Sequence, residues 1–277
     1  MLTNKKSFWL TGPYLIWIAG FIIIPLLTIV FYAFTDSTKS FTFSNIIDAI
    51  SDTSNLKALL LTLLLALSAT AICLLLAYPL ALCLTKLKMK KKNFLIFLFI
   101  LPMWMNFMLQ MVAINVILED NGIINAFLSF LGLPNIHIAN TYLAILIGMV
   151  YDYLPFMLLP IYNTVSRIDN DLINASKDLG ANAIRTFLKV TLPLSMPGVI
   201  SGITMVFVPA ISDFAIAEML GGGKIMLIGN VVEMSFTKGH YYQGSGLALL
   251  LMLFVILSSA LTEAKDNSAE QGGAVIL

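Results

Sequence analysis

Long apolar runs separated by short polar segments make up most of this chain. A helix that crosses a bilayer needs about 20 mainly apolar residues, and six runs meet or approach that length. We expect spans at residues 8–34, 58–84, 94–118, 142–164, 194–216 and 245–262. A polar tail, 263–277, follows the last run. The pattern predicts an all-α integral membrane protein with one transmembrane domain, residues 1–262.

Composition agrees with lipid as the solvent of this chain. Hydrophobic residues make up 59% and charged residues only 11%, against about 25% charged residues in soluble domains. The net charge of +1 offers no basic surface for nucleic acid. Cys73 and Cys83 lie about 15 Å apart along one helix, which no disulfide spans. We therefore expect neither a disulfide nor a metal site.

The Lys and Arg residues predict the orientation in the membrane, because cytoplasmic loops carry an excess of them. Twelve of the 16 fall in segments on one side, including five lysines within residues 86–92 and four basic residues within 167–189. Both termini and the segment 165–193 are therefore expected in the cytoplasm. The first run is too long for the apolar core of a signal peptide, so we expect an uncleaved first span.

The polar segment 165–193 predicts two short amphipathic helices under the membrane. Asp169 or Asn170 can cap the first helix, and Gly180 fits the position after its end, where positive φ is common. A second amphipathic stretch, residues 181–191, is expected to stop at Leu192–Pro193 before the next span. The alternative is a plain amphipathic connector that rests on the lipid surface.

The same segment resembles the coupling loop of permease subunits of ABC importers. That signature reads Glu-Ala-Ala, three residues, Gly, nine residues, Ile, one residue, Leu-Pro. Here Asn174 replaces the Glu and Ser176 replaces the second Ala, while the glycine, the Leu-Pro and the spacings are kept. The resemblance implies that this loop docks on a separate ATPase. The residues expected to couple the two are Asp171, Asn174, Ala175, Ser176, Asp178, Gly180, Leu192 and Pro193.

Three further patches, at residues 78–81, 154–157 and 227–231, are similar to the spermidine/putrescine (PotB-like) permeases of that family. The resemblance implies a type I importer permease fold in the bacterial cytoplasmic membrane. It also implies three partners: a second, PotC-like permease, a PotA-like ATPase dimer and an extracytoplasmic, PotD-like polyamine-binding protein. The chain is then a transport subunit and not an enzyme. It binds no cofactor itself, and ATP–Mg is bound by the partner ATPase.

A polyamine path needs spaced carboxylates and aromatic faces for its ammonium groups. Asp152 lies about 15 Å into its span, where an ionisable group is a functional candidate. The residues expected along the path are Asp152, Glu218, Asp213, Trp104 and Tyr151. Glu119 and Asp120 can add to an anionic outer mouth. The alternatives are a neutral, hydrogen-bonded Asp152, solvated loop carboxylates and aromatic rings that only pack.

The glycine-rich segment 221–224 does not match a nucleotide-binding loop, because Ile225 follows the lysine where Ser or Thr is needed. ATP hydrolysis is therefore expected on another subunit. Two alternatives stay open at this point: an importer permease for another small solute, and an ATP-independent secondary transporter.

Overall fold

The structure, a computed structural model, describes residues 5–274, and their backbone is helical except for loops and one isolated bridge between Thr35 and Phe41. Six of its helical segments are long and apolar enough to cross a membrane, which confirms the expected number of spans. These segments are Gly12–Ala33, Thr53–Thr85, Phe107–Phe130, Tyr142–Val165, Ala183–Ser212 and Tyr241–Ala260. The described residues form two compact units, which are treated separately here.

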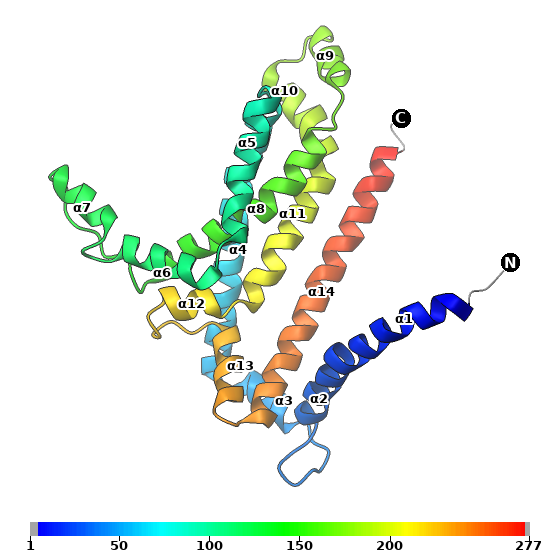
Figure 1. Cartoon of the computed structure of the whole chain (residues 1–277), viewed down its shortest axis with the longest axis vertical. Coiled ribbons are helices and arrows are strands. Elements are labelled where there is room, and N and C mark those ends of the chain that lie inside the picture. Colours follow the sequence, from blue (N-terminus) through cyan, green and yellow to red (C-terminus); the bar gives the residue numbers. More distant parts are fainter. Residues whose placement is uncertain (1–4, 275–277) are drawn as a thin grey trace. The chain divides into compact units, whose positions relative to one another are not determined.

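The first unit combines residues up to 57 with residues 231–254. It contains α1 (Lys5–Ile18), a π-helical turn (Ala19–Ile23), α2 (Ile24–Ala33) and α3 (Ser44–Ser51), with the parts of α13 and α14 that fall in this range (Figure 1). The buried side chain of Asn45 fastens α3 to the end of α2. Its amide donates to the carbonyl oxygens of Tyr32, Ala33 and Thr35, the last at 2.8 Å. Tyr32 also packs edge-on against Tyr242, with ring centroids 5.4 Å apart.

The second unit combines residues 58–230 with residues from 255 onward. Its helices are α4 (Thr53–Thr85, from residue 58), α5 (Met89–Ile100), α6 (Phe107–Leu118), α7 (Ile123–Phe130), α8 (Tyr142–Val165), α9 (Asn170–Asp178), α10 (Ala183–Thr186), α11 (Leu192–Ser212) and α12 (Ala215–Leu220). Three helices contribute to both units: α4, α13 (Ile228–Thr237) and α14 (Tyr241–Ala274). The backbone of the expected polar tail is therefore helical as far as it is described.

The expected third span, residues 94–118, is two helices and not one. A 3-10 turn, Leu101–Trp104, separates α5 from α6. Asn106 starts α6 as its N-cap, since its side chain accepts the N–H of Leu109 at 3.2 Å. The buried Gln110 side chain donates to the carbonyl oxygen of Pro102, which also accepts the N–H of Met105, and so ties α6 to the break. Side chains thus replace the helical hydrogen bonds that irregular backbone loses in a membrane.

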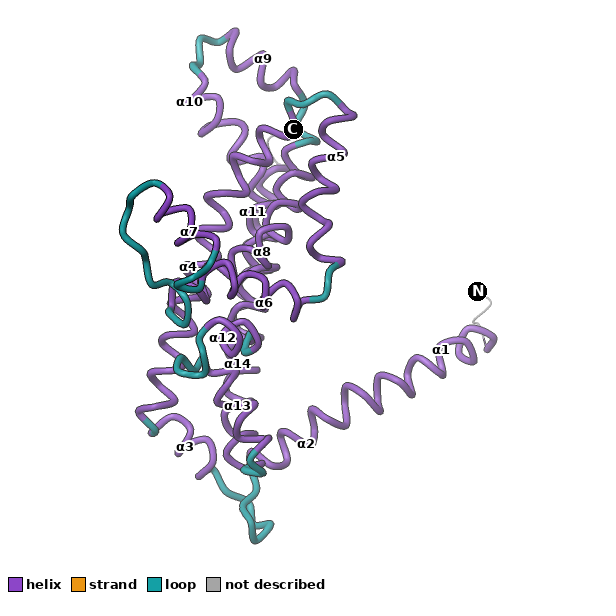
Figure 2. Tube along the Cα trace, turned by 60° about the vertical axis from the view of Figure 1, so that its left-hand side comes forward, coloured by secondary structure: helices purple, strands orange, loops and turns teal. Residues whose placement is uncertain are grey.

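Helices α8 and α11 run side by side and form the most extensive helix pair of the second unit (Figure 2). Two glycines of α11 face α8 directly. A Cβ on Gly198 would lie 2.7 Å from the carbonyl oxygen of Pro160, and one on Gly202 would lie 2.8 Å from the sulfur of Met157. The small-residue pair therefore permits a close approach of the two backbones, as such pairs do in membranes.

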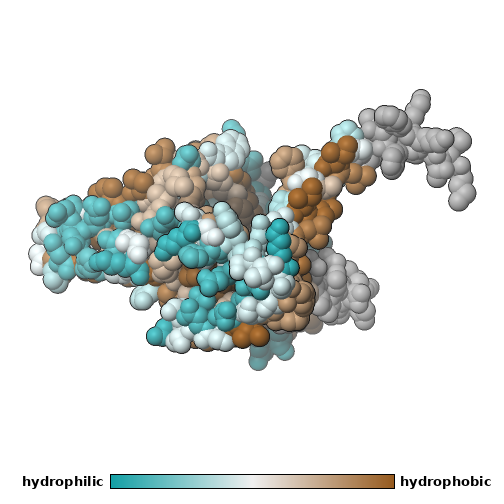
Figure 3. Space-filling view, turned by 90° about the horizontal axis from the view of Figure 1, so that it is seen from below, coloured by the Kyte–Doolittle hydropathy of each residue, from teal (hydrophilic) through white to brown (hydrophobic). Residues whose placement is uncertain are grey.

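Many large hydrophobic side chains of the described chain are exposed, and in the view of Figure 3 brown apolar patches lie beside hydrophilic areas. In the first candidate span, Gly12–Ala33, none of the most apolar window is buried against the rest of the chain. Phe21 is 72% exposed and Ile16 is 75% exposed. Exposed apolar surface of this extent marks contact with lipid or with another protein.

Candidate functional site

The α9–α10 hairpin, residues 169–186, is built on local backbone motifs. Asp169 caps α9 by accepting the N–H of Asp171 at 3.0 Å, as expected for one of the two candidate caps. At the other end, Gly180 donates to Lys177 O at 2.8 Å and Ala181 donates to Ser176 O at 3.1 Å. This pair of bonds is a Schellman motif, which requires a left-handed residue after the helix. Gly180 has φ 81°, so the predicted glycine elbow is confirmed.

A side-chain hydrogen bond holds the two arms of the hairpin together. The hydroxyl groups of Ser176 and Thr186 lie 3.0 Å apart, and Thr186 is buried. Asn182 starts α10 by accepting the N–H of Arg185 at 2.9 Å. Ser176, one of the two departures from the importer signature, therefore lies between the arms instead of on the outer face.

The outer face of the hairpin exposes both polar and apolar side chains. Of the expected coupling residues, Asp171, Asn174, Ala175 and Asp178 are exposed. Apolar residues join them, since Leu179 is 90% exposed and Ile184 is 69% exposed. A mixed surface that includes exposed large apolar groups suits a protein partner better than water alone.

The expectation that Leu192–Pro193 ends the second arm is wrong. Residues Ala183–Ser212 form one continuous helical segment of 30 residues. A π-helical turn, Phe187–Thr191, precedes the proline, and Leu192 donates its N–H to the carbonyl oxygen of Phe187. Proline lacks the N–H that the next α-helical bond requires, and the wider turn ends at that point. The second arm of the hairpin therefore runs directly into α11.

The buried Tyr78 fastens α4 to the beginning of α11. Its hydroxyl lies 2.6 Å from the hydroxyl of Ser195, and its ring packs edge-on against Phe187 at 5.5 Å. Tyr78 belongs to the patch 78–81 that carries part of the resemblance. Tyr78 therefore connects α4 to the helical segment into which the hairpin continues.

Two of the expected path carboxylates meet where α8 and the end of α11 approach each other. Asp213, the C-cap of α11, accepts the Tyr153 hydroxyl at 2.6 Å and the N–H of Ile216 at 3.0 Å. Asp152 is half-buried and close enough to Asp213 for electrostatic interaction. No hydrogen bond to Asp152 occurs within the described chain. Two carboxylates, only one of them hydrogen-bonded, therefore share a partly buried region.

Sequence reasoning missed Tyr153. Successive residues of a helix point about 100° apart, so Tyr151, Asp152 and Tyr153 lie on different faces, and only Tyr151 of the two tyrosines was expected along the path. The structure buries Tyr153 and leaves Tyr151 40% exposed. A tyrosine on the buried face of a helix usually needs a hydrogen-bond partner for its hydroxyl. The sequence alone does not identify Asp213 as that partner.

The patch 227–231 supports the loop that carries Asp213. Asn230 donates from its side chain to the carbonyl oxygen of Phe214 at 2.8 Å. A Cβ on Gly229 would lie 3.0 Å from the carbonyl oxygen of Asp213, so a larger residue there would force this backbone to shift by a few tenths of an ångström. Ile228 donates its N–H to the buried Thr62 hydroxyl at 2.9 Å, which fixes the patch to α4. The patch thus acts on the position of Asp213.

The other expected path residues do not join this pair. Glu218 is exposed on α12. Trp104 is 79% exposed and packs edge-on against Phe97 at 6.4 Å. Within the described chain, no hydrogen bond or ring contact connects Glu218, Trp104 or Tyr151 to Asp152. Among the described residues, no group of three or more His, Cys, Asp or Glu side chains is arranged to hold a metal ion.

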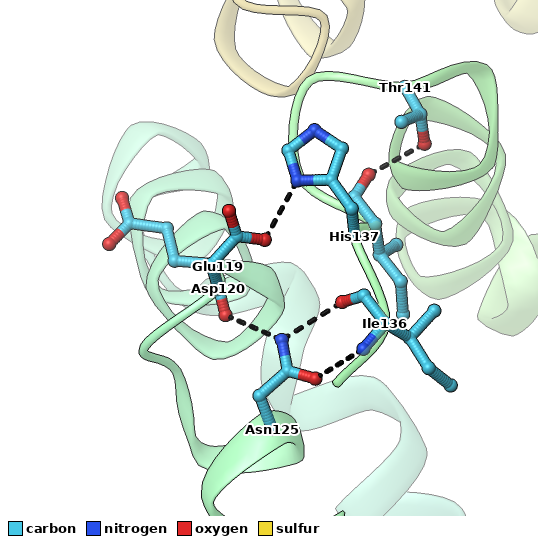
Figure 4. Close-up of polar contacts among 7 residues, drawn as sticks. Glu119, Asp120, Asn125, Ile136, His137 and Thr141 are labelled. Atoms are coloured by element: carbon cyan, nitrogen blue, oxygen red, sulfur yellow. Dashed lines mark hydrogen bonds and ion pairs between the residues drawn. The ribbon is translucent and has the colours of Figure 1, made fainter. Parts of the chain in front are cut away.

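The loops around α7 hold the carboxylates that were expected at an outer mouth (Figure 4). Asp120 pairs with His137, whose Nδ1 lies 2.7 Å from the carboxylate, so this loop histidine is not merely solvated. Asn125 exchanges two hydrogen bonds with the backbone of Ile136, at 2.8 and 2.9 Å. Its amide also donates to the backbone oxygen of Glu119 at 3.3 Å. The Asp120 carboxylate is therefore held beside the His137 ring.

Known proteins resemble both the sequence and the fold. The PotB spermidine/putrescine transport system permease proteins are 41% identical over 170 residues in Haemophilus influenzae and 40% identical over 144 residues in Escherichia coli K12. These regions cover 59% and 51% of this chain and 59% and 52% of the relatives, so the chain matches little more than half of their length. A bacterial ABC transporter that imports the acidic polysaccharide alginate has the same fold, with a TM-score of 0.72 at 16% identity over 95% of this chain and 96% of that chain.

A family model supports the same assignment over a longer region. The description of that family is binding-protein-dependent transport system inner membrane component, and residues 74–267 match it. The matched region includes the α9–α10 hairpin, Tyr78, the Asp152–Asp213 pair and the patch 227–231. The chain therefore belongs to the family of binding-protein-dependent transport system inner membrane components.

Proposed function

We propose that this chain is the permease subunit of an ATP-driven importer for polyamines. With a second permease it would form the path for spermidine or putrescine, which an extracytoplasmic binding protein delivers. A separate ATPase subunit would bind ATP–Mg and hydrolyse it, while this chain performs no covalent chemistry. The similarity to the PotB permeases supports the substrate class.

The observation that carries the proposal is the α9–α10 hairpin. It is a small, well-capped unit with exposed Leu179 and Ile184 on its surface, and its second arm continues into α11 without a loop. A docking surface joined rigidly to a span is what an energy-coupling element requires. The bias of Lys and Arg residues supports a cytoplasmic position for it, where an ATPase would meet it.

The Asp152–Asp213 pair supports a cationic solute. Asp152 lies inside a candidate span, where a carboxylate costs about 2.5–3.5 kcal/mol to insert at the centre and is a functional candidate. One carboxylate is fixed by Tyr153 and the other is without a hydrogen bond in the described chain. A linear amine with several positive charges can bridge two such groups. Affinity would then be modest, which permits release into the cytoplasm.

Uptake of labelled spermidine into proteoliposomes tests the proposal. The vesicles hold this chain, its partner permease and the ATPase, with ATP inside and binding protein outside. We expect uptake that requires both ATP and this chain, and loss of most uptake in Asp152→Asn and Asp213→Asn with ATPase binding retained. Asp48→Asn is the matched control, because Asp48 is an exposed carboxylate on α3 outside the expected path.

Each result separates one part of the proposal from the others. Uptake without ATP would overturn the importer. ATP-driven uptake of another solute but no spermidine uptake would keep the importer and discard the polyamine. Normal uptake by both aspartate variants would remove the carboxylate pair from the path.

A further inference from the structure

A cavity of about 560 Å³ lies behind the α9–α10 hairpin, where three long helices end. Thr85, the last residue of α4, and Val165, the last residue of α8, both line it, and so does Thr191 at the start of α11. Because two candidate spans end at Thr85 and Val165, the cavity lies at the level of the boundary between lipid and water. Its volume is within the range of sites for small ligands.

The charged residues that line the cavity are all basic. Lys86, Lys92 and Lys177 line it from three different segments, and none of its lining residues is acidic. Within the described part of the chain, none of these lysines forms an ion pair. Lys92 is half-buried, with its ammonium 5.9 Å from the centre of the Tyr162 ring, which restricts its position. Three converging ammonium groups without a counter-ion suit an anionic ligand.

The rest of the lining indicates what kind of anion this is. Leu82, Ile168, Ile173 and Phe187 form an apolar wall beside the lysines, while Asn170 adds amide N–H donors. A free inorganic anion gains nothing from the apolar wall. A phospholipid places its phosphate at the headgroup level and its acyl chains against apolar side chains of the spans. Basic pockets between spans on the cytoplasmic side recognise such headgroups.

We propose that this cavity binds the headgroup of an anionic phospholipid, with the phosphate held by Lys86, Lys92 and Lys177. The lipid would contact α4, α5, α8 and both arms of the hairpin at once, and so hold the hairpin against the ends of the spans. The inference rests on the membrane embedding within the proposed function and does not depend on the solute.

The chain offers a matched control for the role of these lysines. Lys88, Lys90 and Lys91 lie in the same short segment, are exposed and do not line the cavity. The variant Lys86→Gln/Lys92→Gln/Lys177→Gln and the variant Lys88→Gln/Lys90→Gln/Lys91→Gln therefore lose equal charge. A general attraction to the membrane surface, or a role in setting the orientation, would be weakened to a similar degree in both.

The experiment is a titration of phosphatidylglycerol into the purified transporter complex in micelles of an uncharged detergent. Native mass spectrometry reports the lipid bound to the chain. We expect the cavity variant to bind phosphatidylglycerol about 100-fold more weakly, at about fivefold per lysine, and the control variant to bind like wild type. Thermal unfolding of both variants in detergent shows whether they are folded.

Three results would overturn the inference. Equal loss in both variants would indicate diffuse attraction, and no loss in either would exclude the cavity. Displacement of the lipid by millimolar inorganic phosphate would identify a free phosphate group as the ligand. Binding is measured without transport, so intact lipid binding together with absent spermidine uptake would count against the proposed function alone.

Discussion

Replacement of Gly180 tests whether the left-handed backbone of the hairpin elbow is required for ATP-driven uptake. Gly180 has φ 81°, and no atom lies within 4 Å of the position that a Cβ would take. A new side chain therefore has space, and the cost comes from the backbone. The left-handed region costs a residue with a Cβ about 1–2 kcal/mol, which is a factor of about 5–30 in the population of the native elbow.

The Ala and Asn variants test that backbone cost, and the Leu variant adds bulk to it. We expect Gly180→Ala to reduce ATP-driven uptake several-fold at normal amounts in the membrane. Gly180→Leu should abolish uptake, because its bulk also enters the docking surface. Gly180→Asn should keep most of the uptake, since Asn tolerates the left-handed region. Gly132→Ala is the control, because Gly132 has φ 71° and open space but lies outside the hairpin.

The assay is uptake and ATP hydrolysis in the same proteoliposomes, with the chain quantified by immunoblot. Normal uptake by Gly180→Leu would refute the coupling assignment. An equal defect in the Asn and Ala variants would refute the backbone argument. An equal defect in Gly132→Ala would indicate a general loss of stability and not a local one.

Three other substitutions test the packing that supports the site, each by thermal unfolding of the detergent-solubilised complex. Tyr153→Phe leaves one oxygen of Asp213 without its donor and should cost about 1–3 kcal/mol and reduce spermidine uptake; unchanged stability would show that the bond is dispensable. Gly198→Ala should cost about 1–3 kcal/mol by overpacking against α8, whereas Gly20→Ala, which meets no neighbour within 4 Å, should not destabilise. Thr62→Val leaves the first N–H of α13 unpaired and should destabilise the protein by about 1–3 kcal/mol. Thr62→Ser keeps the hydroxyl and should be as stable as wild type. Equal stability of the wild type, the Val variant and the Ser variant would contradict this.

The features that could be predicted are those encoded by neighbouring residues. Span number follows from apolar run length, because lipid requires it. The Asp169 cap and the Gly180 elbow follow from the backbone groups at helix ends, which a few consecutive residues satisfy. Proline disfavours a continuous helix, so Pro102 alone indicates where the expected third span can break. The N-cap at Asn106, which starts the next helix, is not part of the expectation for residues 94–118.

The features that could not be predicted join distant positions. Tyr153 and Asp213 are 60 residues apart, and Thr62 and the N–H of Ile228 are 166 residues apart. Which residues form such pairs depends on which faces of the helices pack together. Helices that are apolar on nearly all sides give little indication of the face that packs. The continuation of the hairpin into α11 depends on the π turn, a register change that periodicity does not show.

The continuous segment Ala183–Ser212 has a mechanical consequence. At 1.5 Å per residue its 30 residues extend about 45 Å, from the second arm of the hairpin to the residue before Asp213. The close packing at Gly198 and Gly202 can act as a pivot for this segment. At the same rise per residue the pivot lies about 22–28 Å from Ala183 and about 15–21 Å from Ser212, so the hairpin is on the longer arm. A tilt of about 5° about the pivot would move the Ser212 end by about 1–2 Å. A shift of that size is a large fraction of the 2.6 Å separation between the Tyr153 hydroxyl and Asp213, so a small tilt imposed at the hairpin would be enough to weaken or break that hydrogen bond.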